Sequence, residues 1–211
     1  MWFFIPKNLT GFHGDTYSML FSDRKLSGLL AFVGGVECIV GIGVAEALYP
    51  GYSVSANPIS DLGATCNSSC TIVEPSSIIF NSSVILLGML GMVASYFVFR
   101  STHRRLLTSF LFLAAVGAVG VGVFPETTGI VHAVMSLIVF LFGGLSAITS
   151  FQVLELPMNY LAVLLGSITI VALALYATHN YAGLGRGGME RMVAYPALLW
   201  LVGFGAHLMK S

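Results

Sequence analysis

Charged residues are scarce in this chain. Only 9% of its 211 residues are Asp, Glu, Lys or Arg, whereas a soluble domain carries about 25%. Apolar residues make up 56%, so the chain lacks the polar surface that a folded protein shows to water and must face lipid. Nine basic and nine acidic residues give a formal net charge of zero, which excludes the basic field that nucleic-acid binding requires. These features predict a single multi-pass domain in the cell membrane.

Cysteine is also scarce, and three residues do not make a disulfide framework. Cys38 lies in an apolar run and is expected to be a small buried side chain. Cys66 and Cys70, in the segment CNSSC, lie in a polar loop, where an oxidising compartment would allow a disulfide. Two free thiols or half of a metal site are the alternatives. Zinc sites usually need four ligands, which favours the disulfide.

Long apolar runs dominate what is present. Each run is about 20 residues long, which at a rise of about 1.5 Å per residue crosses a hydrocarbon core of about 30 Å. The expected spans are residues 28–48, 77–99, 106–124, 130–151, 158–177 and 192–209. Glycines inside these runs favour close helix packing over small residues. The predicted fold class is therefore all-α, a polytopic membrane protein with six transmembrane helices in residues 28–211.

The lysines and arginines predict the orientation of these helices. With the N-terminus in the cytoplasm, the inner segments hold seven of the nine, and the outer segments hold only Arg186 and Arg191. Both termini are therefore expected in the cytoplasm. Residues 1–27 would be a cytoplasmic segment whose Trp2, Phe3 and Phe4 suit the membrane interface. Residues 49–77 would form an ordered extracytoplasmic loop over the outer end of the bundle.

Ionisable residues in the outer segments are candidates for a functional site. Charged groups at membrane depth are costly, so they usually face the bundle interior and pair with one another. We expect an outward-facing polar pocket made by Ser60, Asp61, Glu126, His132, Glu190 and Arg191. Arg191 and His132 would hold an anionic group, while Asp61 and Glu126 would order the pocket. In a purely structural alternative, Arg191 neutralises Asp61 or Glu126, and His132 bonds a loop carbonyl.

Three of these residues raise a chemical alternative. Asp61, Glu126 and His132 could bind a divalent metal that activates water, or act as a general acid–base pair. The protein would then be a membrane-embedded hydrolase or transferase acting on a lipid-linked substrate. The HExxH and GxSxG motifs are absent, so the sequence leaves open whether the protein is an enzyme.

Glu37 is an ionisable residue near the middle of the first predicted span. A charge at the bilayer centre costs about 3 kcal/mol or more, so such residues usually have a role. A proton or cation pathway would need such a group. A neutral Glu37 bonded to a serine or tyrosine of a neighbouring helix would have a structural role only.

Four motifs, in the order YPGYS, NPISDLGA, GVFPETTGIVH and ERMVAYPALLW, resemble a known family. The family is a group of multi-pass prokaryotic membrane proteins catalogued as domain-of-unknown-function family number 998. The resemblance covers about residues 28–207 and implies architecture rather than activity. ISDLG followed by VEPSSIIF is also similar to the pattern of the Frag1/DRAM/Sfk1 membrane proteins, which are tied to lipid remodelling and lipid distribution. That similarity implies the shared positions Ser60, Asp61, Gly63, Glu74 and Phe80.

The favoured functional hypothesis is a lipid-associated protein whose outward polar pocket binds a lipid headgroup or a lipid-linked ligand. Membrane lipids are the expected partners. The glycine-rich helix faces and the small size also fit an accessory subunit of a larger membrane complex or a homo-oligomer.

Overall fold

Six long helices form the protein in a computed structural model, which describes residues 22–66 and 69–210. In this part of the chain the helices are α2 (Asp23–Leu48), α3 (Ser76–Thr102), α4 (Arg105–Val123), α5 (Ile130–Thr149), α6 (Met158–Ala177) and α7 (Gly185–Lys210). All six are long and apolar enough to cross a membrane, which confirms an all-α polytopic membrane protein. Trp2, Phe3 and Phe4 lie outside the described residues.

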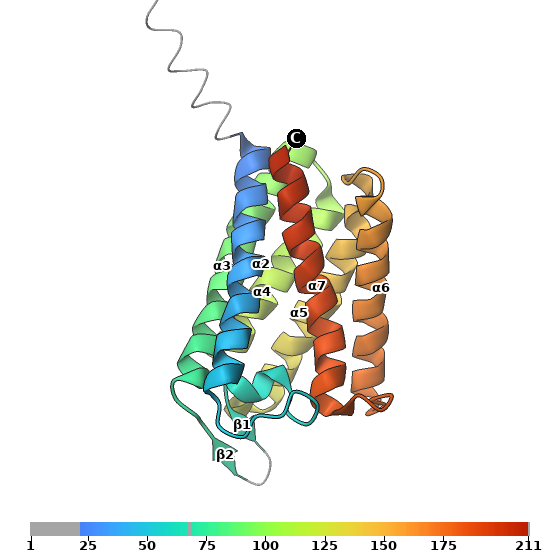
Figure 1. Ribbon diagram of the computed structural model, residues 1–211. Helices are drawn as coiled ribbons and strands as arrows, with labels where there is room; N and C mark the ends of the chain where they lie inside the picture. Colours follow the sequence, from blue (N-terminus) through green and yellow to red (C-terminus); the bar gives the residue numbers. More distant parts are fainter. Residues whose placement is uncertain (1–21, 67–68, 211) are drawn as a thin grey trace, which may run out of the picture.

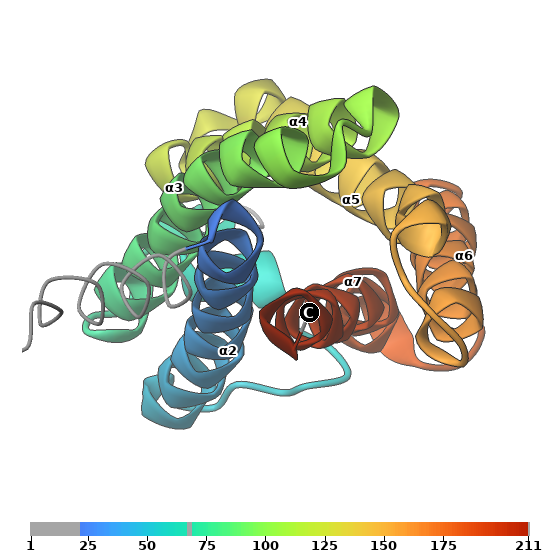
Figure 2. The same cartoon turned by 90° about the horizontal axis from the view of Figure 1, so that it is seen from above.

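The helices follow one another around a ring. Helices that are consecutive in the sequence pack side by side, and α7 closes the ring by packing against α2 (Figure 2). The start of α2 and the C-terminus lie at one end of the bundle, whereas the connection between α2 and α3 lies at the other (Figure 1). The α4–α5 and α6–α7 connections share that second end, here called the outer end after the predicted orientation.

Glycines bring neighbouring helix backbones into contact. A Cβ atom added to Gly28 of α2 would lie 2.6 Å from the Gly205 carbonyl oxygen of α7, and one added to Gly88 of α3 would lie 2.6 Å from the Ala115 carbonyl oxygen of α4. Larger residues at these positions would push the helices apart. Close packing over small residues therefore holds the ring together, as is usual in lipid.

Large apolar side chains on the outer faces of the helices are exposed. Examples are Leu29, Val40, Leu137, Leu164 and Leu199. The most apolar windows of α5 and α6 are each 22% buried, whereas those of α4 and α7 are each 50% buried. Because these faces are hydrophobic and unpacked, they contact membrane lipids.

Helix boundaries match the predicted spans closely at α6 and differ most at α7. Helix α6 occupies the predicted range, and Pro157 directly precedes it. Helix α2 begins five residues earlier than expected, because the Ser22 hydroxyl accepts a bond from the Lys25 N–H and caps the helix. Helix α7 begins at Gly185, seven residues before the predicted start, so Gly185, Gly187 and Gly188, which lie between the two last predicted spans, are helical.

The connection between α2 and α3 is ordered and covers the outer end of the bundle. It contains a short 3₁₀ helix, Ile59–Leu62, and two short antiparallel strands, β1 (Thr65–Cys66) and β2 (Cys70–Thr71). Cys66 and Cys70 are joined by a disulfide. Ile59 and Leu62 are buried against side chains of the bundle. We call the described residues 49–66 and 69–75 the cap.

Candidate functional site

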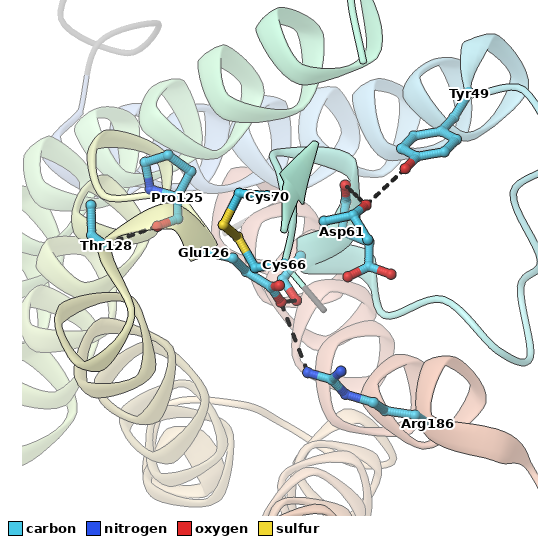
Figure 3. The surroundings of a disulfide bond; sticks show 10 residues. Tyr49, Asp61, Cys66, Cys70, Pro125, Glu126, Thr128 and Arg186 are labelled. Carbon is cyan, nitrogen blue, oxygen red and sulfur yellow. Dashed lines mark hydrogen bonds and ion pairs between the residues drawn. A yellow bond between two sulfur atoms is a disulfide. The ribbon is translucent and has the colours of Figure 1, made fainter. Parts of the chain in front are cut away.

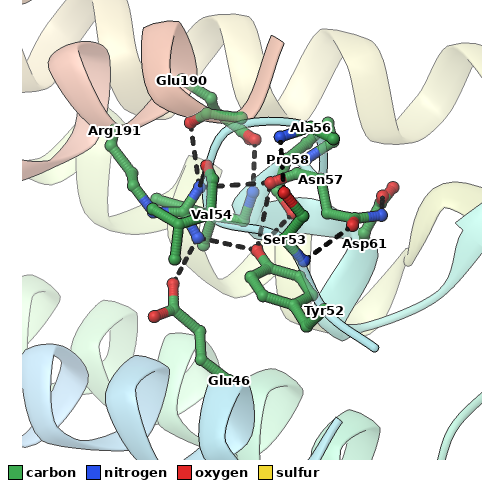
Figure 4. A network of polar contacts seen from close by, with 12 residues as sticks. Glu46, Tyr52, Ser53, Val54, Ala56, Asn57, Pro58, Asp61, Glu190 and Arg191 are labelled. Carbon is green, nitrogen blue, oxygen red and sulfur yellow. Dashed lines mark hydrogen bonds and ion pairs between the residues drawn. The ribbon is translucent and has the colours of Figure 1, made fainter. Parts of the chain in front are cut away.

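Arg191 fastens the cap to α7. Its guanidinium NH1 donates to the carbonyl oxygens of Val54 at 2.8 Å, Asn57 at 3.1 Å and Gly187 at 2.9 Å. Its NH2 forms an ion pair with Glu46 at the end of α2 and donates to the Tyr52 hydroxyl at 2.8 Å. Figure 4 shows this side chain reaching from α7 into the turn of the cap. These contacts occupy both terminal nitrogens. The side chain is only 8% exposed, so little of it is accessible to a ligand.

A glycine allows the cap to approach α7 this closely. A Cβ atom added to Gly187 would lie 2.1 Å from the Asn57 carbonyl oxygen and 2.6 Å from that of Val54. The Gly187 N–H lies in the first turn of the helix and therefore has no acceptor within it. It donates to the Ser55 carbonyl oxygen at 2.9 Å. Backbone therefore packs directly on backbone, which explains why small residues begin this helix.

Tyr52 extends the Arg191 contacts within the cap. Its hydroxyl donates to the Pro58 carbonyl oxygen at 2.7 Å while it accepts from Arg191. Burial raises the pKa of Tyr52 above its ordinary value, which keeps the hydroxyl protonated and able to donate. The Tyr52 ring also lies under the Arg191 guanidinium, 5.5 Å from ring centre to carbon. In this group of Glu46, Tyr52 and Arg191, both terminal guanidinium nitrogens and the tyrosine hydroxyl have partners, whereas the Arg191 Nε is buried without a hydrogen-bond partner in the described part of the chain.

Three carboxylates form a second polar group beside the first. Glu190, which is 6% exposed, accepts the Ile59 N–H at 2.6 Å. Glu126, in the α4–α5 turn, accepts the Ser60 hydroxyl at 2.7 Å. Asp61 accepts the Asn57 side-chain amide at 2.8 Å. The 3₁₀ helix of the cap thus brings together predicted residues from three distant parts of the sequence.

Arg186 is the basic side chain of this second group. Its Nε donates to the Tyr176 hydroxyl at 3.2 Å, and its NH2 lies 4.0 Å from Glu126 Oε1. The side chain is 44% exposed. Figure 3 shows it facing Glu126 and Asp61 close to the Cys66–Cys70 disulfide. We call Ser60, Asp61, Glu126, Arg186 and Glu190 the outer cluster.

Asp61 titrates in an unusual setting. Burial raises the pKa of Asp61 above its ordinary value, the Asn57 amide opposes that shift, and the nearby Glu126 carboxylate adds to it. The proton affinity of Asp61 is therefore set by desolvation and by its neighbours in the outer cluster.

His132 stands apart from the carboxylates in its bonding. Its Nδ1 is 2.7 Å from the Phe124 carbonyl oxygen, so this nitrogen bonds the loop carbonyl as in the structural alternative. Within residues 22–66 and 69–210, no group of three His, Cys, Asp or Glu side chains is placed to hold a metal ion. The divalent metal at His132, Asp61 and Glu126 stays a prediction from the sequence.

Below the outer cluster lies an apolar chamber of about 120 Å³ inside the helix ring. Side chains of α2, α3, α4, α5 and α7 line it, and Ile59, Ser60 and Glu190 belong to its outer end. The chamber and the outer cluster share Ser60 and Glu190, so an apolar space meets a polar surface there.

Glu37 lies away from both polar groups, between α2 and α3. The Ser83 hydroxyl of α3 hydrogen-bonds its carboxyl group, as in the structural alternative for this residue. Its Oε2 is buried without a hydrogen-bond partner in the described part of the chain. The proton or cation pathway stays a prediction.

Four contributors to the site were not singled out from the sequence. They are Tyr52, Asn57, Arg186 and Gly187. In the sequence, Arg186 is only a topology signal, although an arginine beside the outer carboxylates is itself a sign of pairing. The sequence gives no comparable signal for Gly187, because glycine before a span is typical of a loop.

The chain was compared with known families, curated proteins and solved structures. A family model described as "Protein of unknown function (DUF998)" matches residues 32–207. No curated protein and no solved structure matches the chain. The family match covers five of the six helices completely or nearly so, together with the cap and the outer cluster. The protein therefore belongs to the DUF998 family of multi-pass membrane proteins.

Proposed function

We propose that the protein is a lipid-associated protein of the cell membrane whose outer cluster binds a lipid headgroup or a lipid-linked ligand. One observation carries the proposal: Ser60 and Glu190 belong both to the polar outer cluster and to the wall of the apolar chamber. An amphiphile needs this combination, because its polar and apolar parts must be bound side by side.

The charges of the outer cluster suit a headgroup that carries a phosphate. Arg186 is exposed and makes one long ion pair at 4.0 Å, so it can exchange Glu126 for a phosphate oxygen. A guanidinium binds phosphate in a bidentate manner. The carboxylates of Asp61 and Glu126 would then accept hydrogen bonds from ammonium or hydroxyl groups of the same headgroup.

Arg191 has a different part in this proposal from the one the sequence suggested. Its guanidinium donates to Glu46, Tyr52 and three backbone carbonyls. An anion at Arg191 would have to displace these partners. Arg191 therefore holds the cap in place, and Arg186 takes the headgroup phosphate.

Lipid-dependent thermal stabilisation tests the headgroup site. The purified protein in detergent is heated with increasing amounts of phosphatidylglycerol, phosphatidylethanolamine or an uncharged diacylglycerol. The phosphate lipids should raise Tm more than diacylglycerol. Arg186→Ala should weaken the apparent affinity for the phosphate lipids about tenfold, which corresponds to about 1.4 kcal/mol.

Arg100→Ala is the matched control. Arg100 also pairs with a carboxylate, Asp23, at 3.0 Å and lies over a tyrosine ring, but at the opposite end of the bundle. This variant should keep the native preference for phosphate lipids. Equal stabilisation of native protein and Arg186→Ala by every lipid would contradict the proposal.

A further inference from the structure

We propose that the apolar chamber holds a stretch of one hydrocarbon tail of the bound lipid, lying parallel to the helices with its headgroup end toward Ser60 and Glu190. The inference rests on the proposed function and adds the class of ligand: an amphiphile with at least one long, unsubstituted hydrocarbon chain. Three features of the chamber carry it, namely its length, its width and the chemistry of its wall.

The length of the chamber matches one leaflet of a bilayer. On α7 its wall runs from Glu190 to Leu201, and on α3 from Phe80 to Gly91. Eleven residue steps at a rise of about 1.5 Å give a wall of about 16 Å. Half of a hydrocarbon core of about 30 Å is about 15 Å. The wall therefore covers the same depth as a tail from the leaflet on the side of the cap.

The width of the chamber suits a single chain. A volume of about 120 Å³ spread over about 16 Å of helix leaves a narrow passage rather than a round pocket. The volume is close to that of an apolar cavity of about 150 Å³ that binds benzene, so the chamber holds a short stretch of one hydrocarbon chain and neither two chains side by side nor a fused ring system. The second tail of a two-tailed lipid would stay in the surrounding bilayer.

The wall of the chamber excludes water along most of its length. Its deep part is lined by apolar side chains such as Leu87, Leu111, Val139 and Leu198. The polar groups at its outer end already have partners, since Ser60 donates to Glu126 and Glu190 accepts the Ile59 N–H. Buried water needs two to four polar partners, so a hydrocarbon occupant fits this wall better than water.

Trp200 offers a direct way to detect the tail. It lines the chamber, is 4% exposed, and its indole N–H donates to the Ser150 hydroxyl at 2.9 Å. The chain has two tryptophans, so Trp2→Phe leaves Trp200 as a single fluorescent reporter. Bromine atoms on a lipid tail quench tryptophan fluorescence on close approach.

The experiment places the Trp2→Phe protein in phosphatidylglycerol vesicles with bromines near the methyl end or near the carboxyl end of the tail. Trp200 lies deep in the chamber, ten residues along α7 from Glu190. Bromines near the methyl end should therefore quench it more strongly. The test variant, Gly143→Leu, adds a side chain inside the chamber, where a Cβ atom would meet its nearest neighbour, Ala197 Cβ, at an unstrained 3.8 Å.

The matched control is Gly43→Leu, which makes the same change on α2 where a Cβ atom meets nothing within 4 Å. Lipid around the bundle reaches both variants equally, so the chamber contribution is the difference between them. We expect Gly143→Leu to lose at least half of the quenching and Gly43→Leu to keep it. Gly143→Val fills less space, should give an intermediate loss, and serves if the leucine variant fails to fold.

Each outcome separates the two proposals. Equal quenching in Gly143→Leu, Gly143→Val and Gly43→Leu would overturn the tail site, whatever Arg186→Ala does to lipid preference. Lost quenching in the Gly143 variants would support the tail site even if Arg186→Ala leaves lipid preference unchanged, which would count against the headgroup site alone. Stronger quenching by bromines near the carboxyl end would overturn the proposed orientation of the tail.

Discussion

Arg186 and Arg191 lie little more than one turn apart on α7, yet their surroundings are opposite. Arg191 is 8% exposed and has five partners among side chains and backbone carbonyls. Arg186 is 44% exposed and has one long ion pair and one contact to a tyrosine. A buried guanidinium with all its partners inside the protein orders the fold, whereas an exposed one with a loose partner is available to a ligand.

The largest expected effect comes from removing Arg191. Arg191→Ala leaves Glu46, whose side chain is 19% exposed, without its cation and frees the cap, so the free energy of unfolding should fall by about 3 kcal/mol. Denaturant unfolding in detergent measures this loss. Arg191→Lys should recover only part of it, because an ammonium group cannot reach Glu46 and the carbonyls together. A loss below about 1 kcal/mol would contradict the comparison.

A smaller loss is expected from Gly187→Ala, which tests backbone packing without touching either arginine. The new methyl group would lie 2.1 Å from the Asn57 carbonyl oxygen, so the cap must shift, at a cost of about 1–3 kcal/mol. Unfolding of this variant is compared with that of Gly43→Ala, whose methyl group meets nothing within 4 Å. Equal stability of the two variants would show that the cap does not need its contact with α7.

The dependence of stability on pH tests the protonation of Asp61 in the outer cluster. The pKa of Asp61 is raised by burial, so the folded protein binds this proton more tightly than the unfolded chain does. The contribution of Asp61 to the free energy of unfolding is therefore largest at acidic pH. It declines as the pH rises above the ordinary Asp pKa of about 3.9. Relative to the native protein, Asp61→Asn should be more stable at neutral pH than at pH 3. If the difference in free energy of unfolding between Asp61→Asn and the native protein did not change with pH, the pKa of Asp61 would not be raised in the folded protein.

The smallest effect on stability is expected from Arg186→Ala without lipid. An exposed ion pair contributes about 0–1 kcal/mol, so unfolding of this variant should be close to native. Its effect should appear only when phosphate lipids are added. A loss as large as that of Arg191→Ala would mean that both arginines order the fold.

Hydropathy was enough to predict the number of helices and most of their bounds, because a span in lipid must be long, apolar and internally hydrogen-bonded. The start of α7 was missed because Gly185, Gly187 and Gly188 are typical of a turn. The small size of Gly185 and Gly187 serves another purpose, which is to admit the cap backbone. That reason is visible only when residues 54–57 and 185–188 are seen together.

The predicted site residues converge only in part, for reasons that lie outside local sequence. Ser60, Asp61, Glu126 and Glu190 gather around the 3₁₀ helix of the cap, as the cost of isolated charge in lipid suggests. The partner of Arg191 is Glu46, and neither Asp61 nor Glu126, because the choice among carboxylates depends on helix rotation. The apolar chamber could not be inferred at all, since no residue pattern separates a lined space from a filled core.

The bonds between Arg191 and the cap join positions 137 and 134 residues apart in the chain. During translation, the segment after α2 leaves the ribosome long before the last helix has been made. Throughout that interval its carbonyl groups have no guanidinium to bind, so the cap matures only when the final span enters the bundle. A nascent chain arrested before α7 should therefore be cut by proteases within residues 53–57, and completion of synthesis should protect it.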